Sequence, residues 1–223
     1  MTTTSAPEET AEKTSTGLEL IRTRIGRILE NMPPSAAPSP PTPEQEEQAL
    51  QKILLDKGVF PIHLKARLSD FHSPPQTPPV FIHGGAGVGK THLAVAYLAR
   101  EIKTRGEASK GFIRSVDLMN RLRDSFRSSY NQAASEIIRG FSRYRFLVID
   151  DLGAERHTDL VQEALYDVLD FRAGHRLPTI ITSNFSLDRV AGHYGDFGER
   201  IASRIAGMGE TMTLLGKDRR WQK

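Results

Sequence analysis

Two stretches of this chain carry the residue types that handle phosphate and a divalent cation. The first, residues 84–91, reads Gly-Gly-Ala-Gly-Val-Gly-Lys-Thr between an apolar run at 79–83 and a helix-forming run. Strand, glycine-rich loop and helix are the context in which backbone N–H groups wrap around a phosphate. Lys90 is expected to reach the β- and γ-phosphates and Thr91 to ligate Mg²⁺, so the sequence predicts a site for ATP and Mg²⁺. The candidate nucleotide-binding residues are Gly84, Gly85, Ala86, Gly87, Val88, Gly89, Lys90, Thr91 and His92.

The second stretch is an acidic pair, Asp150 and Asp151, after the apolar run at 145–149. The carboxyl ends of parallel strands meet at one edge of a sheet, where ligands collect. Asp150 is therefore a candidate partner of Mg²⁺, and Asp151 a candidate for orienting a water against the γ-phosphate. Such a pair can also cap a helix, but its position about 60 residues after the glycine-rich loop favours the metal role.

Three further polar residues are candidates for catalysis. Asn184 follows another apolar strand, 179–183, and is expected either to sense the γ-phosphate or simply to close a turn. Arg200 and Arg204 lie one helical turn apart and share a face. They are either solvated or placed to reach a neighbouring subunit's phosphate site as an arginine finger.

The elements that must position these residues alternate along the C-terminal part of the chain. Strands are expected at 79–83, 112–115, 145–149, 179–183 and 211–215. Helices are expected at 90–104, 116–128, 132–142, 158–173, 187–193 and 197–206. This alternation predicts an α/β fold with a parallel five-stranded sheet flanked by helices.

The N-terminal part has a different organisation. The expected order is a disordered tail (1–15), a helix (16–31), a Pro-rich linker (32–43), a helix with a connecting segment (44–78) and the α/β domain (79–223). The first helix carries an apolar stripe, and a lone helix of this length is marginal in water. Its stripe must dock on the protein's own core, on a twin helix or on a partner, and the linker favours a partner. The stripe consists of Leu18, Ile21, Ile25 and Ile28.

Composition excludes several classes of protein. The chain has 223 residues, is 38% hydrophobic and 26% charged, and has no cysteine, so disulfides and thiolate zinc sites are excluded. No apolar run approaches the roughly 20 residues of a membrane span, and the N-terminus lacks the pattern of a secretion signal. We therefore expect a cytoplasmic protein.

A basic region between residues 111 and 145 is a candidate surface for nucleic acid. The formal net charge of +3 permits such binding without requiring it. Arginines interleaved with aromatic residues suit single-stranded DNA, although a solvated basic helix pair has the same composition. The candidate DNA-binding residues are Arg121, Arg123, Arg127, Tyr130 and Arg143.

Four segments of the chain, 89–94, 150–155, 177–187 and 198–205, resemble the DnaC/DnaI group of replicative-helicase loaders. The resemblance covers about residues 60–220 and implies an AAA+ ATPase core. It implies that residues 84–91 are Walker A, that Walker B ends at Asp150 and Asp151, and that Asn184 is sensor 1. It further implies that Arg204 is the arginine finger, with Arg200 beside it. The segment Asp218, Arg219, Arg220 is similar to the family's C-terminal arginine segment, and which arginine faces nucleotide is left open.

This resemblance implies an ATP-dependent loader that binds a hexameric, DnaB-type replicative helicase, places it on single-stranded DNA and self-associates in the complex. The N-terminal helix would then grip the helicase through its apolar stripe. Asp151 stands where many AAA+ proteins have Glu, which favours slow, switch-like hydrolysis. The chain also departs from some relatives in lacking a cysteine-based zinc domain, and it ends soon after the last strand, so no helical lid is expected. Two alternatives remain: an IstB-like transposition helper that binds duplex DNA and recruits a transposase, and a nucleotide-binding adaptor with negligible hydrolysis.

Overall fold

The computed structural model describes residues 41–127, 131–155 and 158–219. The predicted tail, the first helix with its apolar stripe, most of the Pro-rich linker, Tyr130 and Arg220 lie outside these ranges. From Pro43 onward the described chain forms one compact unit. Within it, no helix has both the length and the apolar composition needed to cross a membrane.

Five parallel strands form the central sheet, in the order β2-β3-β4-β1-β5. Their bounds are Phe81–His83 (β1), Lys110–Arg114 (β2), Phe146–Leu152 (β3), Thr179–Ser183 (β4) and Thr211–Thr213 (β5). Because β4 lies between β3 and β1, the carboxyl ends of these three strands are neighbours. The glycine-rich loop, the acidic pair and Asn184 follow or terminate these three strands, so the strand order gathers them at one edge.

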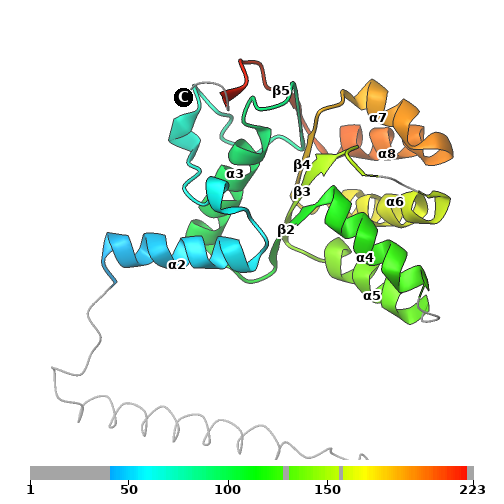
Figure 1. Cartoon of the computed structure of the whole chain (residues 1–223), viewed down its shortest axis with the longest axis horizontal. Helices are drawn as coiled ribbons and strands as arrows, with labels where there is room; N and C mark the ends of the chain where they lie inside the picture. The colour runs from blue at the N-terminus through cyan, green and yellow to red at the C-terminus, as the bar shows by residue number, and fades with distance from the viewer. Residues whose placement is uncertain (1–40, 128–130, 156–157, 220–223) are drawn as a thin grey trace, which may run out of the picture. The chain divides into compact units, whose positions relative to one another are not determined.

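Helices cover both faces of this sheet (Figure 1). Their bounds are Pro43–Asp56 (α2), Lys90–Arg105 (α3), Ser115–Arg127 (α4), Asn131–Ser142 (α5), Asp159–Gly174 (α6), Leu187–His193 (α7) and Gly195–Met208 (α8). Two short 3-10 helices, η1 (Pro61–His63) and η2 (Leu68–Asp70), lie in the segment between α2 and β1. The predicted α/β fold with a five-stranded parallel sheet flanked by helices is confirmed.

Alternation along the strands divides the core into two layers. Val148 and Ile180 face the cluster formed with α2 and α3, whereas Ile149 and Ile181 face the cluster formed with α4 to α8. All four side chains are fully buried. A strand covered on both faces reads as a continuous apolar run, which is why the sequence signalled these strands so clearly.

One predicted boundary near the acidic pair is wrong. The sequence placed the end of the third strand at Ile149, but β3 continues through Asp150 and Asp151 to Leu152. Its pairing with β4 shifts register between Ile149 and Leu152, and Asp151 has a φ of 58°. A local irregularity of this kind has no period-2 signature, so hydrophobic patterning could not reveal it. The strands expected at 79–83 and 211–215 are likewise shorter in the structure.

Candidate nucleotide-binding site

The loop at residues 84–91 joins the carboxyl end of β1 to the first turn of α3. Gly87 and Gly89 have φ values of 71° and 104°, in the left-handed region that residues with a side chain rarely adopt. Gly89 also precedes α3 and offers no side chain to cap its first amides. These amides lack partners within the helix and lie at the positive end of its dipole. The loop therefore presents backbone donors suited to an anion such as phosphate.

Lys90 links this loop to the end of β4. The residue is 8% exposed, and its Nζ donates to the carbonyl oxygens of Gly84 at 3.0 Å and Gly85 at 2.7 Å. It also donates to Oδ1 of Asn184 at 2.8 Å, across 94 positions of sequence. The structure thus brings together two of the residues predicted to contact the phosphates. Phosphate oxygens would compete for the same ammonium donors.

Asp150 receives two hydroxyl hydrogen bonds on one carboxylate oxygen. Thr91 Oγ1 donates to Oδ1 at 2.8 Å and Thr182 Oγ1 donates to the same atom at 2.6 Å. Burial raises the pKa of Asp150, and these two hydrogen bonds act in the opposite direction. A buried carboxylate beside the threonine hydroxyl is a donor set that suits a hard cation.

Hydrogen bonds to both backbone groups of Asp151 hold this residue in its left-handed conformation. Its backbone N–H donates to Thr182 Oγ1 at 2.9 Å, and its carbonyl accepts from Ser115 Oγ at 2.7 Å. Its Oδ1 accepts from Asn184 Nδ2 at 3.0 Å. A non-glycine residue with positive φ persists only where neighbouring contacts determine it. These contacts fix the carboxylate beside Asn184, which itself accepts from Lys90.

Sequence reasoning missed Thr182, although its hydroxyl serves both acids. The only available signal was its polar character near the carboxyl end of an apolar strand, and threonine is common in strands for other reasons.

These side chains line a cavity of about 650 Å³ at the carboxyl edge of the sheet. Besides the loop and the acidic pair, its wall includes Phe60 and Ile62, from the connecting segment to which the sequence analysis gave no functional role. Phe60 is 45% exposed and Ile62 is 77% exposed. Arg114, at the end of β2, stacks over the Phe60 ring at 4.7 Å and holds Asp117 through two hydrogen bonds of 2.7 Å. The cavity therefore combines an apolar wall with a phosphate loop, which is the composition of a nucleotide pocket.

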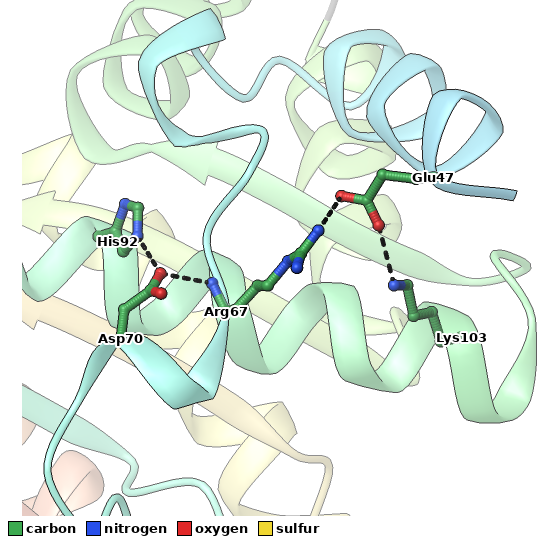
Figure 2. A network of polar contacts seen from close by, with 5 residues as sticks. All are labelled: Glu47, Arg67, Asp70, His92 and Lys103. Atoms are coloured by element: carbon green, nitrogen blue, oxygen red, sulfur yellow. Dashed lines mark hydrogen bonds and ion pairs between the residues drawn. The ribbon is translucent and has the colours of Figure 1, made fainter. Parts of the chain in front are cut away.

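His92, predicted to contact nucleotide, lines the cavity, but its ring contacts a carboxylate of the segment before β1. Its Nε2 lies 2.8 Å from Oδ2 of Asp70 in η2. The same carboxylate oxygen accepts the backbone N–H of Arg67 at 2.9 Å, and Figure 2 shows this arrangement. His92 thus ties the start of α3 to the segment before β1.

The C-terminal segment reaches the loop as well. The Arg219 backbone N–H donates to the Gly87 carbonyl at 3.1 Å, and its guanidinium stacks over Phe71 at 4.9 Å. Arg219 is part of the cavity wall. Arg219 therefore lies at the cavity, while Arg220 is outside the described residues and the choice between the two arginines stays open.

Arg200 and Arg204, on α8, lie outside the wall of this cavity. Arg204 Nε contacts Asp170 Oδ1 at 2.5 Å, and its Nη2 donates to the Tyr166 hydroxyl at 3.3 Å. Arg200 stacks over the Tyr166 ring at 4.1 Å. Both guanidinium groups are thus held on the α6/α8 surface, and neither reaches the phosphate loop of its own chain.

The candidate DNA-binding residues occupy adjoining helices. Arg121 and Arg123 are on α4, and Arg143 is exposed just after α5. Phe141, one of the aromatic residues of this basic region, is buried in the core. Tyr130 and the side chain of Arg127 lie outside the described part of the chain. The structure leaves these DNA contacts as predictions.

Comparisons with known proteins identify the family of this chain. Residues 72–214 match the family described as IstB-like ATP binding protein. The replicative helicase loader DnaI of Bacillus subtilis is 29% identical over 168 residues, covering 71% of this chain and 52% of the loader. An ATP-binding protein in an insertion sequence of Mycobacterium tuberculosis is 32% identical over 105 residues, covering 47% of this chain and 40% of that protein.

The chain therefore spans about half the length, or less, of these two relatives. A crystal structure of the DnaC helicase loader superposes with a TM-score of 0.52 and 26% identity, covering 81% of this chain and 95% of that one. The predicted resemblance to the DnaC/DnaI and IstB group is confirmed. The family match covers more than half of the chain and includes the glycine-rich loop and the acidic pair, so the chain belongs to the family of IstB-like ATP binding proteins.

Proposed function

We propose that this protein is an ATPase that loads a hexameric replicative helicase onto single-stranded DNA. The observation that carries the proposal is the identity to the DnaI loader across 71% of this chain. Asn184 is hydrogen-bonded to both Lys90 and Asp151, and this arrangement supports a site that hydrolyses ATP as well as binding it. Localisation in the cytoplasm is proposed with it.

In this proposal, each side chain of the site has its own role in ATP hydrolysis. Lys90 and the loop amides bind the β- and γ-phosphates and offset the charge that develops on them. Asn184, which bridges Lys90 and Asp151, holds a water in line with the γ-phosphate. Asp151 accepts a proton from that water. Because aspartate is one methylene shorter than glutamate, we expect slow turnover.

Magnesium fits the residues that face the phosphate loop. In the described ranges, no group of three or more His, Asp or Glu side chains could hold a metal by itself. Mg²⁺ bound with a nucleotide needs only one or two protein oxygens, because phosphates and waters complete its shell. Thr91 Oγ1 and Asp150, 2.8 Å apart, supply these oxygens. The ion would neutralise phosphate charge.

A neighbouring protomer completes each site in this proposal. Arg204 is exposed on α8 and lies outside its own chain's cavity, as a residue acting in trans must. It would donate to the γ-phosphate of the adjacent protomer, with Arg200 beside it. The partner helicase is gripped by the apolar stripe of the N-terminal helix.

A second candidate function is that of a transposition helper that binds duplex DNA and recruits a transposase. The 32% identity to the insertion-sequence protein favours it, as does the family description itself. Both candidates use the same ATP chemistry, so the form of the DNA and the protein partner distinguish them.

The test compares partners and DNA together. The full chain is mixed with the hexameric replicative helicase of the same genome and a non-hydrolysable ATP analogue, and complexes are separated by size. Affinity is measured for a labelled single strand and for the matching duplex. The loader requires a stable helicase complex and a preference for the single strand. Duplex preference without a helicase complex supports the transposition helper and overturns the loader.

A variant pair tests the N-terminal helix. Ile21→Asp with Ile25→Asp should release the helicase while ATP binding and the melting temperature stay unchanged. Thr23→Asp lies off the apolar stripe by helical spacing and should retain the helicase. If the double variant still binds the helicase, the helix is not the gripping element.

A further inference from the structure

A second cavity, of about 720 Å³, opens at the amino edge of the sheet. Its wall is built from the starts of β3 and β4, the C-terminal part of α3 and the segment that joins α6 to β4. The ATP site lies at the carboxyl ends of the same parallel strands. The two cavities are therefore at opposite edges of the sheet, and the second has no part in the chemistry described above.

The wall of this amino-edge cavity is strongly basic. Four arginines contribute to it, against a single carboxylate, Glu101. That carboxylate is already paired, because Arg105 Nη1 lies 3.2 Å from Glu101 Oε2. The four arginines are Arg100, Arg105, Arg172 and Arg176.

Arg172 adds a buried charge that has no counter-ion among the residues that the structure describes. Its guanidinium is fully buried, and burial lowers its pKa to about 10, so it stays protonated at neutral pH. Its hydrogen-bond partners in the described ranges are all neutral. They are Thr179 Oγ1 at 2.8 Å and the carbonyl oxygens of Phe141 (3.1 Å), Ser142 (3.2 Å), Tyr144 (2.8 Å) and Pro178 (2.7 Å). A cation that is hydrogen-bonded but not neutralised favours a nearby anion.

Arg100 and Arg176 keep their donors available. Arg100 stacks over the ring of Tyr97 at 5.0 Å, which leaves the edge of its guanidinium for hydrogen bonds. Arg176 is exposed and follows the end of α6. Neither forms an ion pair with any residue that the structure describes. Two planar guanidinium groups on one wall match the oxygen geometry of a phosphate group.

We propose that the amino-edge cavity binds a phosphate-bearing anion through Arg100 and Arg176. Its volume lies within the range of small-ligand pockets, roughly 300–1,000 Å³. The phosphate belongs either to a free phosphorylated compound or to the backbone of a DNA strand that passes this edge. The inference does not depend on the helicase-loading proposal.

The other two arginines are poor targets for a test. Arg105 is in the last turn of α3 and Arg172 in the last turn of α6. Both therefore also offset the negative ends of helix dipoles, and substituting them would change stability. Arg100 and Arg176 are not in the last turn of a helix. Substituting them therefore changes the charge of the cavity without removing a charge that offsets a helix dipole.

The experiment uses the full chain carrying Lys90→Ala, which keeps phosphates from the ATP loop. Binding of inorganic pyrophosphate is measured by calorimetry, and binding of a fluorescent 20-nucleotide single strand by anisotropy. Adding Arg100→Gln and Arg176→Gln should weaken at least one of these probes about tenfold or more. Arg189→Gln, which removes an exposed arginine of α7 near the carboxyl edge, is the matched control and should leave both affinities unchanged.

The two probes distinguish the sources of the phosphate. Loss of pyrophosphate binding supports a free phosphorylated ligand, and loss of strand binding alone supports the DNA backbone. Unchanged affinity for both probes in the double glutamine variant, with an unchanged melting temperature, overturns the proposal. So does failure of the Lys90→Ala chain to bind either probe.

Discussion

At the scale of single residues, one hydroxyl holds both acids of the candidate site. Thr182 Oγ1 donates to Asp150 and accepts from the backbone N–H of Asp151. Since Asp151 has positive φ, its geometry depends on such contacts more than that of an ordinary strand residue does. We therefore expect Thr182 to be a positioning residue, which would act on ATP through its neighbours.

We expect Thr182→Val to lower kcat for ATP hydrolysis about tenfold or more, with little change in the affinity for ATP. Valine keeps the shape of the side chain but leaves the Asp151 amide without its acceptor and Asp150 Oδ1 with only the hydrogen bond from Thr91. Leaving such a group unsatisfied costs about 1–3 kcal/mol. Steady-state ATPase assays and ATP titration check this. Thr213→Val, which removes the β5 hydroxyl that contacts His83 of β1, is the matched control. Equal kcat in the two variants would contradict the positioning role.

At the scale of elements, two sets of polar contacts add to the apolar packing between neighbouring segments. Arg172 ties the end of α6 to the end of α5 and the turn that follows it through the carbonyl oxygens of residues 141, 142 and 144. Glu47 ties α2 to α3 through Lys103, at 3.1 Å, and to the following segment through Arg67, at 3.4 Å (Figure 2). The first contact is buried and the second is partly exposed, so their energies should differ strongly.

Arg172→Met should destabilise the protein by about 3–5 kcal/mol, because several buried carbonyl groups lose their donor. Urea unfolding followed by circular dichroism measures the change. Arg176→Met, four positions along and exposed, should change the unfolding free energy by less than about 0.5 kcal/mol. A similar small cost for both variants would mean that other donors replace the guanidinium.

Glu47→Gln should cost only about 0.5–1 kcal/mol at pH 7, because the pair is partly solvated. The hydrogen bond from Lys103 is the main cause that lowers the pKa of Glu47 below its usual 4.5. A carboxylate with a lower pKa in the folded state stabilises above its unfolded pKa, and this contribution is lost as the pH falls through the folded pKa. The difference from wild type should therefore shrink below pH 4.5. Glu46→Gln, on the same helix, is the control, and a difference for Glu47→Gln that grows on acidification would contradict the sign.

At the scale of the whole molecule, the ATP site and the candidate finger lie on separate surfaces of one protomer. Lys90 is in the cavity at the carboxyl edge, whereas Arg204 is bound to Asp170 on the α6/α8 surface. In the proposed function, Arg204 would therefore complete the site of a second copy rather than that of its own chain. To do so, the arginine must exchange the Asp170 carboxylate for a phosphate.

Arg204→Ala should bind ATP normally but hydrolyse it about 10³-fold more slowly in the assembled complex. Lys90→Ala should bind no ATP. Mixing these two inactive variants should restore part of the activity, because one supplies the phosphate loop and the other the arginine. Turnover measured against the mixing ratio tests this. Normal turnover of Arg204→Ala alone, or an inactive mixture, would remove the role in trans.

Much of this fold could be predicted from local patterns. Helix α7 lies at Leu187–His193 and strand β4 at Thr179–Ser183, as their periodicity indicated. The errors gather where local rules are broken, as at Asp151, whose strand continues past the predicted end. The spacing of hydrophobic residues indicates which side of a helix or strand is buried. A register shift between two strands also depends on the neighbouring strand, so the spacing does not reveal it.

The sequence by itself determined the phosphate loop, because residues 84–91 are contiguous and their glycines, lysine and following helix act together locally. It also determined the alternation of strands and helices, and hence the class of fold. The tertiary structure decided which residues share the site. Thr91 meets Asp150 across 59 positions and Lys90 meets Asn184 across 94. These contacts follow from the strand order β3-β4-β1, and the order is set by the packing of whole elements, which short-range patterns do not encode.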